Sequence, residues 1–378
     1  MRRAFLLALA GLQILLLAGK GGVRDNYREL EQLLVIQTMG LDTRSNGVTL
    51  SLAATGDSRQ GVKRLRAAAS SVTAAMERIR AESFEEELFC AHIGQLLIGE
   101  KAAEAGLEDV LADLARSPDL RLDLPVYVVR EDTAESAVMQ VGDDSRGICD
   151  VMDTVEQGIL RRGGSGRTTA ARITADGERF GAALVCALRL TRAAEQEGET
   201  DEKAQLTVSP EGYAVLRDGK LCSYLTAEQA VAVGLLLNES GAAEIPLRDS
   251  YGRTAVLEIS GGSSRIRPVF SGEGQLTGLR IDARVDASVV EQGAAGDAAY
   301  ADLLTARLEE YLAREIESVL RSSRDLKADF LGLAARVERA EPAAFQALGQ
   351  DFAELLPELE LEVTVSARLR HTNDRKEG

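Results

Sequence analysis

The stretch YRELEQLLVIQTMGLD (27–42) decides how the folded part of the chain begins. Its second half is mainly apolar and β-branched and ends near Gly40, which predicts a buried strand. The segment VTLSLAAT (48–55) alternates in polarity and follows a turn at 43–47, so it is the expected hairpin partner of that strand. A sheet-containing body is therefore expected from about residue 24 onward.

Upstream of this strand lies MRRAFLLALAGLQILLLAGK (1–20), in which two arginines precede an apolar run. The run 4–19 is shorter than the ~20 residues of a membrane-spanning helix and fits a signal or anchor segment better. A buried amphipathic helix is the alternative, but the run is apolar on all sides. If the segment stays uncut, the arginines favour a body on the outer side of the membrane.

The bulk composition excludes several classes of function. The chain has 378 residues, a net charge of -16, 4% aromatic residues and no Trp. An acidic chain of this kind is not expected to bind nucleic acid, because phosphate binding needs a basic face. Two histidines and four cysteines without a C-x-x-C pair predict no zinc site, and buried free thiols are favoured over a disulfide, which stays open: Cys90, Cys149, Cys186 and Cys222.

The first predicted domain covers residues 24–192. Helices are expected at 63–81, 133–141 and 149–163. A further helix should begin at Glu100, and a separate one should end near residue 117. Strands are expected near 92–98 and 124–130. His92 is interpreted as a structural histidine within the apolar strand, because no nucleophile stands at a recognisable spacing. The glycine-rich segment 161–168 lacks the spacing of a phosphate loop and is interpreted as a flexible loop.

The second half follows an acidic linker at 193–204 and is predicted as a domain of residues 205–370 with a polar tail, 371–378. A middle subdomain, 205–245, is expected to hold a hairpin around an Asp-Gly turn and a helix from Thr226 to about Asn238. Strands near 253–260, 264–271, 276–289 and 360–369 should form a sheet covered on one face by an amphipathic helix, 298–322. The predicted fold class is α+β, elongated, with two to three mixed-sheet subdomains and helices packed on the sheets.

Several segments together resemble one family, the Ger(x)C proteins, which are the C subunits of GerA-type spore germinant receptors. The segments that carry the resemblance are RELE (28–31), GLD (40–42), HIG (92–94), IGEKAAEAG (98–106), LARSPDLR (114–121), the hairpin region 212–225 and KADFLGL (327–333). The resemblance covers nearly the whole chain in the right order. It implies the positions at which structural or interface roles are expected: Arg28, Glu29, Asp42, His92, Arg116, Arg121 and Asp329.

The resemblance implies a non-enzymatic, lipoprotein-like receptor subunit on the outer face of the spore inner membrane, beside integral A and B subunits. Ligand binding in the family is attributed chiefly to the membrane subunits, so no catalytic, cofactor-binding or metal residue is assigned. The chain departs from the family at Lys20, which follows Leu-Ala-Gly where the lipid-modified cysteine belongs. A lysine amine cannot form that thioether, so no lipid attachment is expected. Anchoring could then rest on an uncut segment or on partner subunits, or the segment is cut by ordinary signal peptidase.

Two other classes of function compete with this interpretation. An exported solute-binding protein of a transporter would need two similar lobes around a hinge, and the two halves of the sequence show no internal similarity. An exported hydrolase would need a nucleophile with its base, and neither Gly-x-Ser-x-Gly nor His-Glu-x-x-His occurs.

Overall fold

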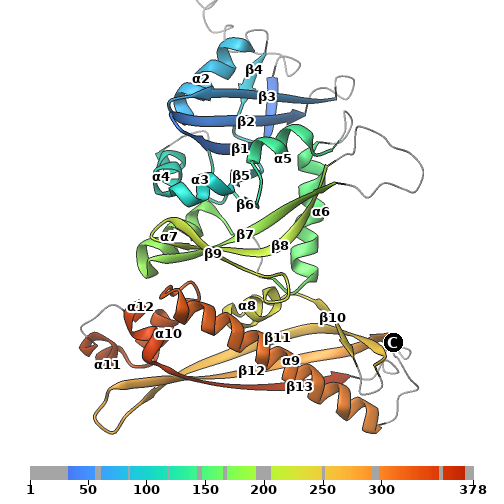
Figure 1. Cartoon of the computed structure of the whole chain (residues 1–378), viewed down its shortest axis with the longest axis vertical. Helices are drawn as coiled ribbons and strands as arrows, with labels where there is room; N and C mark the ends of the chain where they lie inside the picture. Colours follow the sequence, from blue (N-terminus) through green and yellow to red (C-terminus); the bar gives the residue numbers. More distant parts are fainter. Residues whose placement is uncertain are drawn as a thin grey trace, which may run out of the picture.

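The structure, a computed structural model, shows an elongated body built on two sheets, one at each end of the long axis (Figure 1). It describes residues 33–55, 61–83, 86–116, 120–142, 147–164, 168–192, 206–248, 252–291, 298–348 and 352–370. The predicted signal segment, the acidic linker, the polar tail and the positions Lys20, Arg28 and Glu29 lie outside the described residues.

The larger sheet has a parallel centre and antiparallel flanks. Its order is β3-β2-β1-β5-β6-β7-β8-β9, with β4 beside the start of β1. The four central strands β1, β5, β6 and β7 are parallel, so their carboxyl ends meet at one edge. The strands are β1 Leu33–Arg44, β2 Gly47–Thr55, β3 Val62–Ala69, β4 Glu87–Phe89, β5 Gln95–Gly99, β6 Val126–Arg130, β7 Ala182–Arg192, β8 Leu206–Arg217 and β9 Lys220–Leu225.

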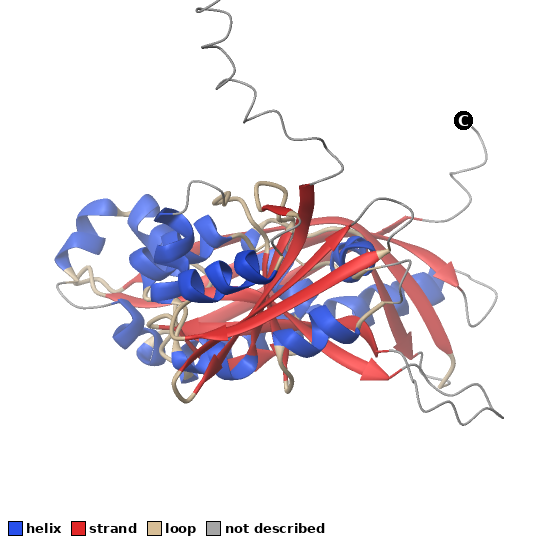
Figure 2. Ribbon diagram, turned by 90° about the horizontal axis from the view of Figure 1, so that it is seen from above, coloured by secondary structure: helices blue, strands red, loops and turns tan. Residues whose placement is uncertain are grey.

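Helices cover both faces of this sheet (Figure 2). One core cluster gathers the buried side chains of α2, α3, α4 and α7, and the other gathers those of α5 and α6. The helices are α2 Val72–Glu82, α3 Glu100–Ala105, α4 Glu108–Arg116, α5 Ala134–Gln140, α6 Ile148–Arg161 and α7 Ala170–Phe180. The three-layer packing explains why the central strands read as continuous apolar runs instead of alternating.

The helix predicted over 63–81 is wrong in its first half. Residues 62–69 form β3, which pairs along its whole length with β2. Ser71 then starts α2, and its hydroxyl accepts a hydrogen bond from the Ala74 N–H. Alanine and arginine favour a helix locally, but pairing with a neighbouring strand outweighs that preference at the sheet edge.

Helix α7 was not predicted, although both of its ends carry recognisable signals. The Thr169 hydroxyl accepts from the Arg172 N–H at the start, and Gly181 is left-handed with φ 65° at the end. These are the side-chain cap and the glycine stop typical of helix boundaries.

The predicted boundary at 193–204 does not separate the two sheets. Strands β7 and β8, on either side of it, pair antiparallel from Ala182↔Arg217 to Arg192↔Leu206. The hairpin β8–β9, predicted for the middle subdomain, therefore completes the larger sheet.

The smaller sheet has the order β10-β11-β12-β13 and is covered on one face, as predicted. The strands predicted at 253–260 and 264–271 are one strand, β11, whose pairing with β12 shifts register between Ile259 and Gly261. The helix predicted at 298–322 is α9, and its apolar stripe is buried: Leu304, Leu308, Leu312, Ile316 and Leu320. The elements are α8 Ala230–Leu237, β10 Ala243–Arg248, β11 Thr254–Phe270, β12 Leu276–Glu291, α9 Ala298–Asp325, α10 Leu333–Ala340, α11 Pro342–Ala347, α12 Phe352–Leu355, a 3-10 turn Leu356–Glu358 and β13 Glu360–Arg370.

Helix α8 and a close contact between Gly163 and Gly234 connect the two sheets. All but the last residue of α8 are buried, and one core cluster continues from the α5–α6 face into the smaller sheet. A Cβ on Gly234 would lie 2.1 Å from the carbonyl oxygen of Gly163, so the backbones meet more closely than any other residue would allow. The observed architecture is α+β, as the sequence predicted.

Candidate functional site

The carboxyl edge of the parallel strands brings two of the resemblance segments into contact. Asp42, near the end of β1, accepts hydrogen bonds from the backbone N–H groups of Ala134 at 2.9 Å and Glu135 at 2.7 Å, at the start of α5. Burial raises the pKa of this carboxyl, and the two backbone bonds oppose that effect. A Cβ on Gly99 would lie 1.9 Å from Asp42 Oδ1, so GLD and IGE fit together only with glycine there.

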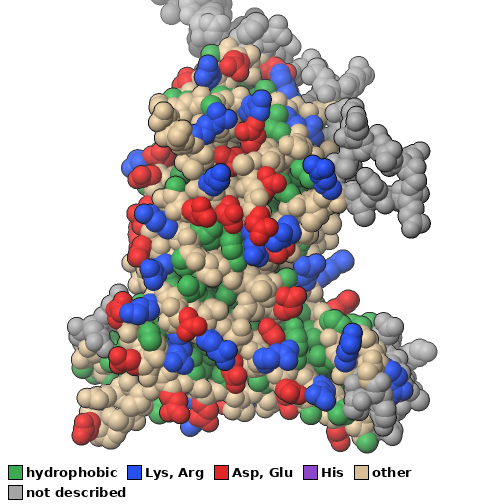
Figure 3. All heavy atoms as spheres, viewed as in Figure 1, with side chains coloured by type: hydrophobic (Ala, Val, Ile, Leu, Met, Phe, Trp, Pro, Cys, Tyr) green, Lys and Arg blue, Asp and Glu red, His purple; other side chains and the backbone are tan. Residues whose placement is uncertain are grey.

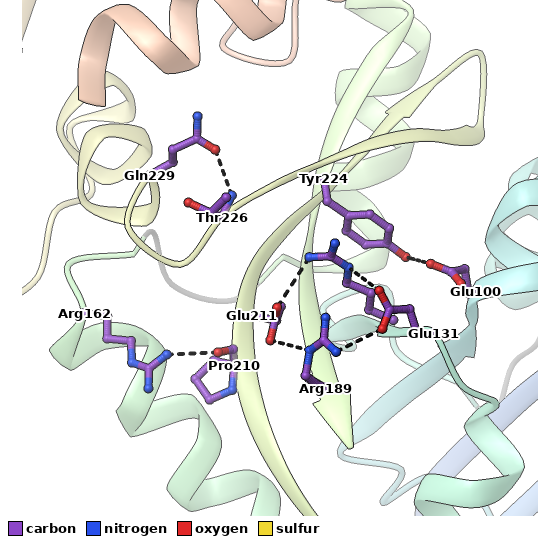
Figure 4. Close-up of polar contacts among 10 residues, drawn as sticks. Glu100, Glu131, Arg162, Arg189, Pro210, Glu211, Tyr224, Thr226 and Gln229 are labelled. Atoms are coloured by element: carbon purple, nitrogen blue, oxygen red, sulfur yellow. Dashed lines mark hydrogen bonds and ion pairs between the residues drawn. The ribbon is translucent and has the colours of Figure 1, made fainter. Parts of the chain in front are cut away.

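Four charged side chains form a closed set of ion pairs at the same edge (Figure 4). Arg189 donates to Glu211 at 2.8 Å and to Glu131 at 2.9 Å, and Arg130 lies 3.4 Å from Glu211 and 3.7 Å from Glu131. Glu131 has a left-handed backbone, φ 59°. Glu211 stands where the pairing of β7 and β8 shifts register, and this bulge turns its carboxylate toward both arginines.

Tyr224 joins this set to α3. Its hydroxyl donates to Glu100 Oε1 at 2.7 Å, and the Arg130 guanidinium lies 4.6 Å from the ring centroid (Figure 4). Burial, followed by the hydrogen bond and charge of Glu100, raises the pKa of Tyr224 far above its ordinary value. The IGE segment is thus tied to the hairpin region 212–225 as well as to GLD.

The composition of the cluster is that of a structural contact between chain segments. Its carboxylates and guanidiniums are matched in ion pairs, and it contains no Ser, Cys or His nucleophile beside a base. Among the described residues, no group of three potential ligands could hold a metal ion. Acidic and basic side chains are also interspersed over the visible face of the molecule (Figure 3).

Asp329 has the same role in the second half of the chain as Asp42 has in the first. It is 2% exposed and accepts from the backbone N–H groups of Leu333 at 2.7 Å and Ala334 at 2.8 Å, which begin α10. Burial raises its pKa to about 7, against the opposing effects of the two backbone bonds and of Arg336. The KADFLGL segment therefore closes the turn between α9 and α10.

His92 is not the buried strand residue that the sequence predicted. It is exposed in the turn between β4 and β5, with its ring 5.4 Å from that of Phe89. The strand begins only at Gln95, because the chain first turns through Ile93, whose N–H donates to the Cys90 carbonyl.

The two predicted arginines within the described residues, Arg116 and Arg121, lie on the surface. Arg116 ends α4 and pairs with Asp113 at 2.6 Å, and Arg121 pairs with Asp123 at 2.5 Å. Arg121 lines a hollow of about 210 Å³ at the amino edge of β5 and β6, together with Gly94 of the HIG segment. The segments HIG and LARSPDLR thus meet at the edge opposite to Asp42.

Sequence reasoning missed the ion-pair cluster and Tyr224. One signal was available, since Arg130 and Glu131 directly follow the apolar run of β6, where the carboxyl ends of parallel strands gather polar groups. The partners Arg189 and Glu211 come from β7 and β8 on either side of the acidic linker, and no local pattern connects them.

Two further observations concern the four cysteines and the described helices. All four cysteines are free thiols, and burial raises the pKa of Cys149 and of Cys186 to about 11. Within the described ranges, no helix has both the length and the apolar character needed to cross a membrane.

The class of protein follows from comparison of the whole chain with known families. Residues 26–148 match the family described as "Spore germination protein N-terminal domain", and residues 211–373 match "Spore germination B3/ GerAC like, C-terminal". The chain belongs to this GerAC-like family of spore germination proteins, the Ger(x)C family.

The fold is similar to that of one solved protein. The crystal structure of the GerBC protein is similar to this chain with a TM-score of 0.58 at 16% identity, over 90% of this chain and 99% of that one. At this identity the likeness concerns the fold. No curated protein matches the chain.

Proposed function

We propose that this protein is a non-enzymatic C-type subunit of a spore germinant receptor, needed for nutrient-triggered germination. The observation that carries the proposal is the pair of family matches, which follow each other along the chain at 26–148 and 211–373. Three motif residues have structural contacts, which supports a non-enzymatic role. Asp42 and Asp329 accept hydrogen bonds from N–H groups at helix starts, and Glu100 of α3 accepts one from Tyr224 of β9.

The proposed location is the outer face of the spore inner membrane, in assembly with integral A and B subunits. Its support is the apolar run 4–19 behind Arg2 and Arg3. Lys20 stands where the lipobox cysteine belongs, and its amine cannot form the thioether, so we propose that attachment rests on the segment itself or on partner subunits. Mass spectrometry of the membrane-associated protein tests this point, and a diacylated N-terminus would refute it.

Deletion of the gene tests the function directly. Spores lacking the protein should fail to germinate with a nutrient that triggers the wild type, and a restored copy should recover the response. Normal germination combined with failed uptake of a solute would instead support the solute-binding alternative. The two described sheets differ in strand number and order, so they do not form the two similar lobes that this alternative requires.

Assembly is tested by affinity capture of the tagged protein from spore membranes, with multi-span subunits encoded beside its gene as the expected partners. Arg28→Ala is the interface variant, expected to impair receptor function. Asp329→Ala is a comparison variant, since its buried carboxylate supports folding and its loss should lower abundance. Wild-type germination and capture with Arg28→Ala at normal abundance would refute the interface role of Arg28.

A further inference from the structure

The uncovered face of the smaller sheet carries a hollow of about 370 Å³ that is lined by arginine and hydroxyl side chains. Helix α9 packs on the other face, where the apolar side chains are buried. We propose that this hollow binds a phosphate group between Arg265 and Arg284. The proposal does not depend on the receptor role.

Strand register places the lining side chains in two neighbouring rows. Ser263 of β11, Arg284 of β12 and Ser366 of β13 form one row. The next row contains Arg265, Asp282 and Thr364. Arg265 and Arg284 are diagonal neighbours on adjacent strands, a relation that puts Cβ atoms roughly 7 Å apart and within reach of long side chains. Both guanidiniums can therefore approach one ligand from two sides.

The charges in the hollow are unbalanced. Its carboxylate, Asp282, is engaged by Arg267. Elsewhere on this face Arg280 pairs with Glu362 at 2.7 Å and Arg370 with Asp286 at 3.6 Å.

Arg265 and Arg284 differ from these paired arginines. Neither forms an ion pair or a side-chain hydrogen bond with any residue in the described part of the chain. The lining contributes three guanidiniums and one carboxylate, in a protein whose net charge is -16. A locally positive patch on an acidic protein attracts anions to that patch.

The donor set favours phosphate over carboxylate. A guanidinium fork binds two oxygens side by side, so one carboxylate satisfies one arginine, whereas a phosphate offers oxygens to two. The hydroxyls of Ser263, Thr364 and Ser366 take part in no side-chain hydrogen bond among the described residues and can donate to the remaining oxygens. The phosphate could belong to a small soluble ester or to a lipid headgroup, and binding measurements separate these sources.

The first arm uses the full-length chain in nonionic detergent, titrated with inorganic phosphate and with glycerol 3-phosphate by calorimetry. Saturable binding is expected, weakened roughly tenfold by Arg265→Gln and again by Arg284→Gln. Arg368→Gln is the matched control. Arg368 is exposed on the same face and forms no ion pair among the described residues, but it does not line the hollow. The control should therefore bind within twofold of the wild type.

The second arm measures binding of the same chains to vesicles of phosphatidylglycerol and of phosphatidylcholine. If soluble esters do not bind, but the double variant loses affinity for phosphatidylglycerol vesicles and Arg368→Gln does not, the phosphate is that of a lipid headgroup. Every chain carries residues 1–20, so their membrane affinity cancels in the comparison. Absence of binding in both arms, or equal loss in Arg368→Gln and the double variant, would overturn the proposal.

Discussion

Replacement of Asp329 by alanine should destabilise the protein more than most single substitutions. The carboxylate is 2% exposed and accepts from two backbone N–H groups, so water cannot replace it when it is removed. A hydrogen bond to a charged group contributes about 1.5–3 kcal/mol. Removal of the buried charge offsets part of that loss, so Asp329→Ala should lower the free energy of unfolding by about 3 kcal/mol at pH 8.

The cost of Asp329→Ala should grow as the pH falls. The pKa of Asp329 is about 7 in the folded protein, raised from 3.8, so between these values the folded state binds the proton more readily than the unfolded state. The proton-linked part of the contribution of Asp329 to stability is therefore greatest below pH 3.8 and is lost as the pH rises through 7, whereas the two backbone hydrogen bonds to the carboxylate remain. From pH 8 down to pH 5.5 the cost of the substitution should increase by about 2 kcal/mol, since each pKa unit corresponds to about 1.4 kcal/mol.

The assay is guanidinium unfolding of the full-length chain, followed by circular dichroism because the chain has no tryptophan. Asp325→Ala is the matched control, because Asp325 is exposed at the end of α9. This control should change the stability by less than about 0.5 kcal/mol. A cost below about 1 kcal/mol at pH 8 would show that Asp329 does not hold the start of α10. A cost that grows with rising pH would show that its pKa is lowered in the fold, contrary to the reasoning.

Three further predictions concern the carboxyl edge of the parallel strands and the cysteine thiols. Gly99→Ala should cost at least about 2 kcal/mol, because the new Cβ would lie 1.9 Å from Asp42 Oδ1, and a stability equal to wild type in denaturant unfolding would contradict this close approach. Tyr224→Phe leaves the α3 carboxylate without its 2.7 Å donor and should cost about 1–2 kcal/mol in the same assay, whereas no loss would show that this tie between α3 and β9 is weak. With a thiol reagent at pH 8, exposed Cys222 should react at once and Cys186, whose pKa burial raises to about 11, only on unfolding; immediate labelling of Cys186 would disprove its burial.

The helix and strand patterns that succeeded were local ones. The stripe of leucines four apart in α9 and the Asp-Gly turn of the hairpin β8–β9 are set by residues within one or two turns of each other. The same holds for the alternation along β12, whose apolar face is buried as expected. Period and turn chemistry are properties of short segments, so the sequence alone was sufficient for them.

The failures came where a distant partner outweighs a local preference. Residues 62–69 look helical by composition and become β3 because β2 offers a strand edge. His92 stands in an apolar segment and is exposed because the strand begins three residues later. The acidic linker does not separate the two sheets, because β7 and β8 pair across it.

The sequence by itself determined the α+β class, the family and the order of its motifs along the chain. Only the tertiary structure decided what the motif residues do. Asp42 accepts hydrogen bonds from backbone N–H groups that lie 92 and 93 residues further along the chain, and Tyr224 reaches Glu100 across 124 residues. An aspartate or glutamate looks the same in the sequence whether its carboxylate binds a ligand, a partner or a helix terminus. The choice depends on which N–H groups or cations the fold brings within about 3 Å, and that distance is not encoded in any local stretch.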